Sequence, residues 1–398
     1  MYPIPASQRL ATLSVAALLL ASASGPALAL DGDAFIAKVN EAYASFNGKL
    51  EFDSIVTEDD TVTVGGARFV SPGQPPFSFG ELQFEGVEET GDGGYTVETV
   101  LVPDIDYTQD DVRLTLVDMS MSGLVVPAKF EPGSIDSLLF YESFTAGPLT
   151  VSVKGKEMFS LESLDGEVTR RDGDTGMDIV MSGDGIAINL ADVEDEKARE
   201  AFRKLGYDKL DGSIKFDMGW DLTGGRLELR EYSFDFDDVG KFDIRLDISG
   251  YTIEFLKAMQ EAQVAAAANP DPQAGANALN FAMLGLVQQL SFNSASIRFD
   301  DDSLTSRALE FAGSEQGVSG KQMADALKGM LPLMLGQLNI PALQQQISAA
   351  AGTFLDNPKS ITITAKPANP VPVPMLMGAA QDPRQMAEIL NVQVTAND

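Results

Sequence analysis

Residues 49–250 alternate apolar and polar side chains with a period of two, and this pattern constrains the fold more than any other feature of the sequence. It is clearest at 226–229, 232–236 and 242–248. A period of two gives each strand one apolar and one polar face. Turns rich in Gly and Asp separate the predicted strands, at Asp92-Gly93-Gly94, Asp172-Gly173-Asp174, Gly183-Asp184-Gly185 and Gly224-Gly225. The pattern predicts a curved, antiparallel β-sheet meander.

Helical periodicity occurs at the start of this region and again after Gly250. Apolar residues recur every three or four positions in 33–46, and a short amphipathic helix is expected at 192–205. The later helices are expected at 252–268, 278–290, 304–311, 320–331, 341–355 and 383–390, with strands at 296–300, 360–365 and 392–395. Between them, the prolines of 367–374 exclude helix and central strand.

Together these patterns predict an α+β protein with two regions. A β-rich meander occupies 30–250, and a helix-rich α+β region at 251–398 packs on or beside it. The sequence leaves open whether the two regions form one continuous domain.

The first 29 residues have the features of an export signal. Arg9 is the only charged residue before an apolar stretch at 10–20, and Ala27-Leu28-Ala29 supplies the small residues that signal peptidase selects. We expect cleavage after Ala29 and export to the periplasm, with full secretion as the alternative. A lipoprotein is excluded because no cysteine is present to carry the lipid. No later stretch is long and apolar enough to span a bilayer, so we expect no transmembrane segment in the mature chain.

The complete absence of histidine and cysteine closes most catalytic routes. Imidazole bases, thiolate nucleophiles and disulfides are excluded, and zinc, copper and haem lose their usual ligands. The sequence also has no Walker motif, no Gly-x-Ser-x-Gly elbow and no Ser-x-x-Lys at a helix start. We therefore expect a binding protein rather than an enzyme. A carboxylate-dependent hydrolase stays open as a third hypothesis, because its paired acids are recognised by their separation in space.

Acidic residues outnumber basic ones by 59 to 28, which gives a formal net charge of −31. This charge excludes nucleic acid as a partner. The run from Asp172 through Asp174 to Asp178 could bind calcium through carboxylate oxygens, and a solvated turn explains the same run without a ligand. Shorter acidic clusters lie at 235–238 and 300–302. The second functional hypothesis is therefore an acidic secreted interaction or structural protein that uses divalent cations.

Four methionines lie on the predicted helices of the second region, at Met283, Met323, Met330 and Met334. Flexible thioethers adapt to varied apolar ligands, although a helix that covers a sheet needs the same apolar stripe for packing. The leading hypothesis is an exported envelope protein that binds an apolar small molecule or lipid, or an envelope protein partner.

One stretch of the meander resembles a known class of proteins. Gly224-Gly225-Arg226-Leu227-Glu228-Leu229, followed by Val239-Gly240-Lys241-Phe242-Asp243-Ile244-Arg245-Leu246, is similar to the Gly-x-Leu-x-Leu strands of large AsmA-like bacterial envelope proteins. The whole chain also resembles uncharacterised secreted bacterial proteins of unknown-function families. The AsmA-like resemblance implies a lipid-handling groove in a curved sheet. The chain departs from that class in its short length and its lack of a membrane anchor, and no site residue can be carried over.

Overall fold

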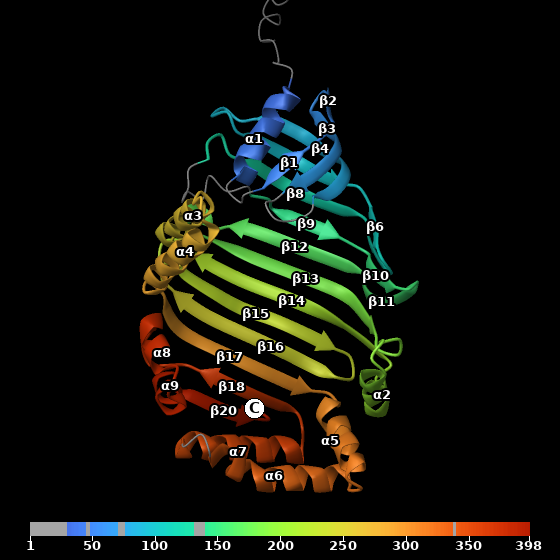
Figure 1. Cartoon of the computed structure of the whole chain (residues 1–398), viewed down its shortest axis with the longest axis vertical. Coiled ribbons are helices and arrows are strands. Elements are labelled where there is room, and N and C mark those ends of the chain that lie inside the picture. The colour runs from blue at the N-terminus through green and yellow to red at the C-terminus, as the bar shows by residue number, and fades with distance from the viewer. Residues whose placement is uncertain (1–29, 45–47, 71–75, 131–139, 337–339) are drawn as a thin grey trace, which may run out of the picture.

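The computed structural model describes residues 30–398 except 45–47, 71–75, 131–139 and 337–339 (Figure 1). The predicted signal peptide at 1–29 lies outside the described residues and stays a prediction. Within them the chain forms nine α-helices and twenty strands, and the strands pair antiparallel in one open sheet. The predicted α+β class and the antiparallel meander are confirmed.

The strands lie side by side in nearly the order in which the chain makes them. The first are β1 (Lys49–Glu51) and β2 (Ser54–Glu58), both paired with β3 (Thr61–Val70), and then β4 (Phe77–Glu89). The last long strands are β13 (Gly176–Asn189), β14 (Lys209–Asp221), β15 (Arg226–Phe236), β16 (Gly240–Ser249), β17 (Ser291–Asp301), β18 (Ser360–Ala365) and β20 (Val392–Ala396). A two-residue strand, β19 (Val371–Pro372), pairs with the start of β17.

Between these groups, four long strands are each broken once. The segments are β5 (Tyr95–Val102) and β6 (Ile105–Gln109), β7 (Val112–Leu116) and β8 (Met119–Val126), β9 (Ser143–Ala146) and β10 (Leu149–Val153), and β11 (Lys156–Leu161) and β12 (Ser163–Arg170). In the sheet, β5, β8, β9 and β12 continue the main meander, while β6, β7, β10 and β11 pair beside them. The breaks therefore line up from strand to strand, and β6, β7, β10 and β11 turn away from the main strands (Figure 1).

All helices except α1 occupy the rim of the sheet (Figure 1). They are α1 (Gly32–Ala44), α2 (Glu196–Leu205), α3 (Ile253–Ala267), α4 (Pro272–Val287), α5 (Leu304–Glu315), α6 (Gly320–Gly336), α7 (Pro341–Asp356), α8 (Val373–Ala379) and α9 (Pro383–Ile389). Helix α1 packs on the first strands, α7 lies against β20, α6 packs on α7 and α5 beyond that edge, and the others flank the strand ends. In the part of the chain that the structure describes, no helix crosses the middle of β13 to β17.

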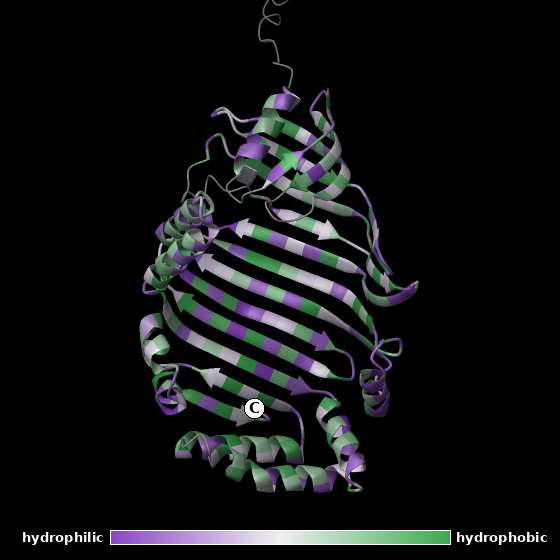
Figure 2. Cartoon of the chain, in the orientation of Figure 1, coloured by the Kyte–Doolittle hydropathy of each residue, from purple (hydrophilic) through white to green (hydrophobic). Residues whose placement is uncertain are grey.

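The strand register separates the side chains into two faces. Directly paired residues share a face, so one row can be followed from β3 to β20. We call it the apolar row, and it consists of Val62, Phe84, Val100, Met121, Phe144, Gly166, Met181, Phe216, Tyr232, Ile244, Ile297, Ile363 and Val394. The face that carries it is the apolar face, and green positions recur along these strands in Figure 2.

The adjacent row belongs to the opposite face, which we call the polar face. Its members are Thr63, Gln83, Leu101, Ser120, Thr145, Asp165, Ser182, Lys215, Ser233, Asp243, Arg298, Thr362 and Thr395. Leu101 is the one hydrocarbon side chain in this row. The period of two seen in the sequence thus continues in register across the whole sheet.

The main hydrophobic core lies under α1. Phe35 is fully buried, and its ring meets those of Phe84 and Tyr95 edge to face, each at 5.2 Å between ring centroids. A smaller cluster forms where α3 begins, around the buried Trp220 and Leu222. There the Trp220 indole donates a hydrogen bond of 2.7 Å to the carbonyl of Tyr251. The core therefore occupies one end and one side of the sheet and leaves its centre uncovered.

Two local predictions are wrong. Gly183-Asp184-Gly185 does not form a turn but lies inside β13, where the register with β14 shifts between Gly183 and Ile186. Gly185 has a φ of 66°, which suits a β-bulge as well as a turn. The segment 367–374 does not stay extended throughout, because α8 begins at Val373. Pro374 lies in the first turn of that helix, where a missing N–H costs no hydrogen bond.

Candidate apolar binding surface

An apolar pocket lies between α1 and the first strands of the sheet. Its volume is about 450 Å³. It is lined by Val39, Tyr43, Leu50, Phe69, Phe79, Leu82, Phe84, Val100, Val102, Met119, Met121, Leu124, Tyr141 and Phe144. A volume of a few hundred Å³ with apolar walls is typical of sites for small ligands. We call it the α1 pocket.

The α1 pocket contains no ionisable group other than two phenols. Tyr43 and Tyr141 supply the hydroxyl groups among its lining side chains. Burial raises the pKa of Tyr43, so this phenol stays neutral. A charged group placed here would lose its hydration without gaining a counter-ion. The pocket is therefore suited to hydrocarbon.

Phe144 links the α1 pocket to the rest of the apolar face. Its side chain lines the pocket from β9. On the neighbouring strand β12, the residue paired with Phe144 is Gly166. A Cβ atom at position 166 would overlap the Phe144 ring, so the glycine makes room for the aromatic side chain. Gly166 in turn pairs with Met181 on β13, which is the next member of the apolar row. The apolar surface thus continues from the pocket onto the open strands without a polar interruption in this row.

Exposure changes along the apolar row. Val62 and Val100 are buried at one end, and Val394 is buried at the other, beside α7. From Met121 to Ile244 the members of the row are partly exposed except for Gly166, which is buried under the Phe144 ring, and Ile297 and Ile363 are 43% and 47% exposed. With strands about 4.8 Å apart, the open part from Met121 to Ile363 is roughly 35–40 Å long. A contiguous apolar surface of this extent marks a binding site more often than ordinary surface.

The polar face is covered by charged side chains that pair with each other. Asp178 accepts hydrogen bonds from Arg171 at 2.6 and 2.7 Å and from Arg230 at 2.7 Å. These guanidinium groups lower the pKa of Asp178 to about 2. Arg230 also pairs with Asp217 on the next strand. Such hydrogen-bonded pairs hold a half-buried carboxylate in its charged form.

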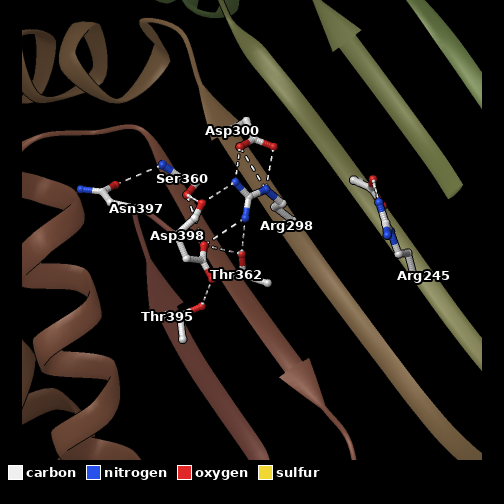
Figure 3. Close-up of polar contacts among 9 residues, drawn as sticks. Arg245, Arg298, Asp300, Ser360, Thr362, Thr395, Asn397 and Asp398 are labelled. Carbon is white, nitrogen blue, oxygen red and sulfur yellow. Dashed lines mark hydrogen bonds and ion pairs between the residues drawn. The ribbon is translucent and has the colours of Figure 1, made fainter. Parts of the chain in front are cut away.

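A second network lies on the polar face of β17, β18 and β20 (Figure 3). Arg298 donates hydrogen bonds to Asp300 at 2.7 Å, to Asp398 at 3.0 Å and to the Thr362 hydroxyl at 3.1 Å. Nearby, Arg245 pairs with the nearly buried carboxylate of Asp243 at 3.0 Å. In both places the carboxylates are hydrogen-bonded to an arginine, so we assign these residues to the stability of the sheet rather than to chemistry on a ligand.

The three predicted calcium ligands are only partly placed by the structure. Asp172 is exposed in a short 3-10 helix, Asp172–Asp174, and Asp178 lies within β13. The side chain of Asp174 is not among those that the structure describes. Where the structure does place side chains, no group of three or more acids could hold a metal ion. Of the other clusters, Asp300 pairs with Arg298, and Asp301 accepts a hydrogen bond from the Thr305 N–H at the start of α5. Calcium binding stays a prediction.

The four predicted methionines do not gather at one site. Met283 lies on α4, while Met323, Met330 and Met334 lie on α6. Met323 is buried, whereas Met330 and Met334 are exposed, and none of the four lines the α1 pocket. The methionines that do line it are Met119 and Met121. The alternation in Met119-Ser120-Met121-Ser122 was the sequence signal that could have indicated them.

Comparison with known proteins adds one finding. The model of a family described only as an uncharacterized protein matches residues 233–397. This range includes β16 to β20 and the helices α3 to α9, and it stops short of the α1 pocket. No curated protein matches the sequence. The match agrees with the predicted likeness to a family of unknown function, and nothing found supports the AsmA-like resemblance.

Among the helices that the structure describes, none combines the length and the hydropathy needed to cross a bilayer.

Proposed function

We propose that this protein binds a lipid, or another molecule with long hydrocarbon chains, on the apolar face of its sheet and does no chemistry on it. One observation carries the proposal. The apolar row runs without a polar residue from the α1 pocket across the sheet, its central part is partly exposed, and Ile297 and Ile363 are exposed. A sheet with only one wet face normally packs its other face against a second layer.

The dimensions agree with an acyl chain. One chain spans about half of the roughly 30 Å hydrocarbon core of a bilayer. The open part of the apolar row could therefore hold two chains end to end, and the α1 pocket could hold the end of one. Burial of ten methylene groups contributes roughly 8 kcal/mol before the costs of ordering the ligand. Hydrocarbon burial is therefore the main favourable contribution to binding, and the costs of association and of ordering the chain are subtracted from it.

The place of action remains a separate prediction. An exported protein would meet lipids and other envelope components in the periplasm, and the predicted signal peptide motivates that location. Extracting lipids from protein purified from envelope and cytosolic fractions would test the location and the ligand class together.

Two neighbouring residues of β13 provide a matched test of the apolar face. Met181 belongs to the apolar row, while Val180 pairs with Glu167 and Asp217 on the polar face and is 48% exposed. We expect delipidated protein to bind a dansyl-labelled fatty acid stoichiometrically. Met181→Gln should weaken binding roughly tenfold, since a buried amide without partners costs more than 1 kcal/mol. Val180→Gln should leave the affinity unchanged.

Two outcomes would overturn the proposal. One is failure of the wild-type protein to take up any apolar probe. The other is an equal loss of affinity in both variants, which would place the ligand elsewhere. Circular dichroism of each variant controls for folding.

A further inference from the structure

Three segments of the chain carry no charged residue at all. They are residues 272–297, 329–355 and 367–381. Residues 10–30, in and just after the predicted signal peptide, are also uncharged, whereas 22% of all residues in the sequence are acidic or basic. Helix α4 lies in the first segment, the end of α6 and most of α7 in the second, and α8 in the third.

The strand register places the helices of the first and third segments, α4 and α8, at the same end of the strands, whereas α7 of the second segment leads back to the opposite end, where β18 begins at Ser360. Helices α3 and α4 connect the end of β16, at Ser249, to the start of β17, at Ser291, and these two residues are directly paired. Helices α8 and α9 connect β18 to β20 at that same end. Helix α6 runs from α5, at the opposite end, back towards it (Figure 1). We call α4, α8 and the C-terminal part of α6 the uncharged rim, and the adjoining α3 and α9 do carry charged residues.

Large apolar side chains project from the uncharged rim. Six of them are at least 50% exposed, namely Phe281, Leu284, Leu333, Met334, Met375 and Met377. We call these six the rim residues. They come from α4, α6 and α8, so separate helices repeat the same feature. Phe281 and Leu333 are 75% and 80% exposed, which internal packing does not explain.

We propose that the uncharged rim docks on the surface of a zwitterionic lipid bilayer. Helix surfaces that carry projecting apolar side chains and no charge suit insertion at the boundary between headgroups and acyl chains. The segments that form them contain no Lys or Arg that would favour anionic lipids, and the strongly acidic remainder of the protein opposes approach to an anionic surface. Charge thus selects the kind of membrane, and hydrophobic contact supplies the binding.

Docking at this rim extends the proposed function and rests on it, because docking would bring the lipid-binding face to its ligand. The apolar residues at the start of α3, Ile253 and Leu256, pack against the cluster of Trp220, which lies beside the apolar face. A lipid that leaves the bilayer at the uncharged rim would therefore have a short apolar route to the open strands.

Vesicle flotation tests the docking. We expect the wild-type protein to float with phosphatidylcholine vesicles. Replacing one-third of the lipid by phosphatidylglycerol should reduce binding at low salt, and added sodium chloride should restore it by screening. The double variant Phe281→Asp with Leu333→Asp should bind phosphatidylcholine vesicles roughly tenfold more weakly. Val56→Asp on β2, where the valine is 51% exposed and remote from the rim, is the matched control and should float like wild type.

Each other result counts against the docking. It is overturned if the wild-type protein does not float, if the double variant floats normally, or if Val56→Asp loses as much binding. Stronger binding to anionic vesicles, or a stable protein partner captured through the rim residues, would also overturn it. The fatty-acid probe separates the two proposals, because the double variant should still bind the probe. If the wild-type protein binds the probe and does not float, the proposed function stands and the docking is overturned. If it floats and does not bind the probe, the docking stands and the proposed function is overturned.

Discussion

Asp178 shows how a single residue of the sequence can serve a role other than the one its neighbours suggest. It stands in an acidic run that resembles a calcium loop, yet its side chain lies on the polar face between Arg171 and Arg230. Its spacing from Asp172 was visible in the sequence. The two arginines were not, because Arg230 reaches it from a strand more than fifty residues away.

This environment predicts a pH-dependent stability. The pKa of Asp178 is about 2 in the folded protein and about 3.9 in an unfolded chain, so its ion pairs stabilise the fold fully above pH 4 and are lost as pH falls towards 2. Asp178→Asn should lower the free energy of unfolding at pH 7 by about 1–2 kcal/mol, after a discount for the 29% exposed side chain. The difference from wild type should shrink between pH 4 and pH 2.

Urea unfolding at several pH values measures this effect. Asp172→Asn, in the same acidic run and exposed, is the control and should change stability by less than about 0.5 kcal/mol. If the two variants behave alike, the arginine pairs do not stabilise the sheet.

At the scale of elements, the bulge in β13 leads to a prediction about the stability of the protein. Gly185 has a φ of 66°, and a Cβ atom there would overlap the Glu162 side chain. Gly185→Ala should therefore destabilise the protein by about 1–2 kcal/mol. Gly329→Ala in α6 should be neutral or stabilising, because its Cβ would meet nothing within 4 Å and alanine favours helix. Thermal unfolding compares them, and equal effects would show that the bulge is not required.

The local elements could largely be predicted from the sequence, and their interruptions could not. The strand predicted at 360–365 coincides with β18, and the helix predicted at 341–355 differs from α7 by one residue. By contrast, the alternation at 226–229 and 232–236 belongs to one strand, β15, and the break between the two stretches corresponds to a register shift between Leu229 and Tyr232. Periodicity detects which way side chains point. It does not distinguish a bulge from a turn, since both use the same residues.

The α1 pocket was beyond the reach of the sequence for a related reason. Its walls come from α1, from strands between β1 and β9 and from Tyr141 just before β9, and each lining residue looked like ordinary core. Whether an apolar face is covered or open depends on where the helices lie. The sequence indicated helices after Gly250, but not that they flank the strand ends and leave the apolar row exposed.

At the scale of the whole molecule, the excess of acidic residues leads to a test that separates general screening of charge by salt from binding of a cation at a specific site. A formal net charge of −31 makes the folded protein repel itself, so sodium chloride should raise its melting temperature. Calcium chloride at the same ionic strength should add nothing further if the acids are matched by arginine and lysine, as on the polar face. A saturable increase caused by calcium alone would instead support the acidic, cation-dependent protein that the sequence left open, since a ligand that binds only the folded state stabilises it in proportion to its affinity. Adding a fatty acid to the same melting experiment completes the comparison, because stabilisation by the fatty acid without stabilisation by calcium is the result that the open apolar face predicts.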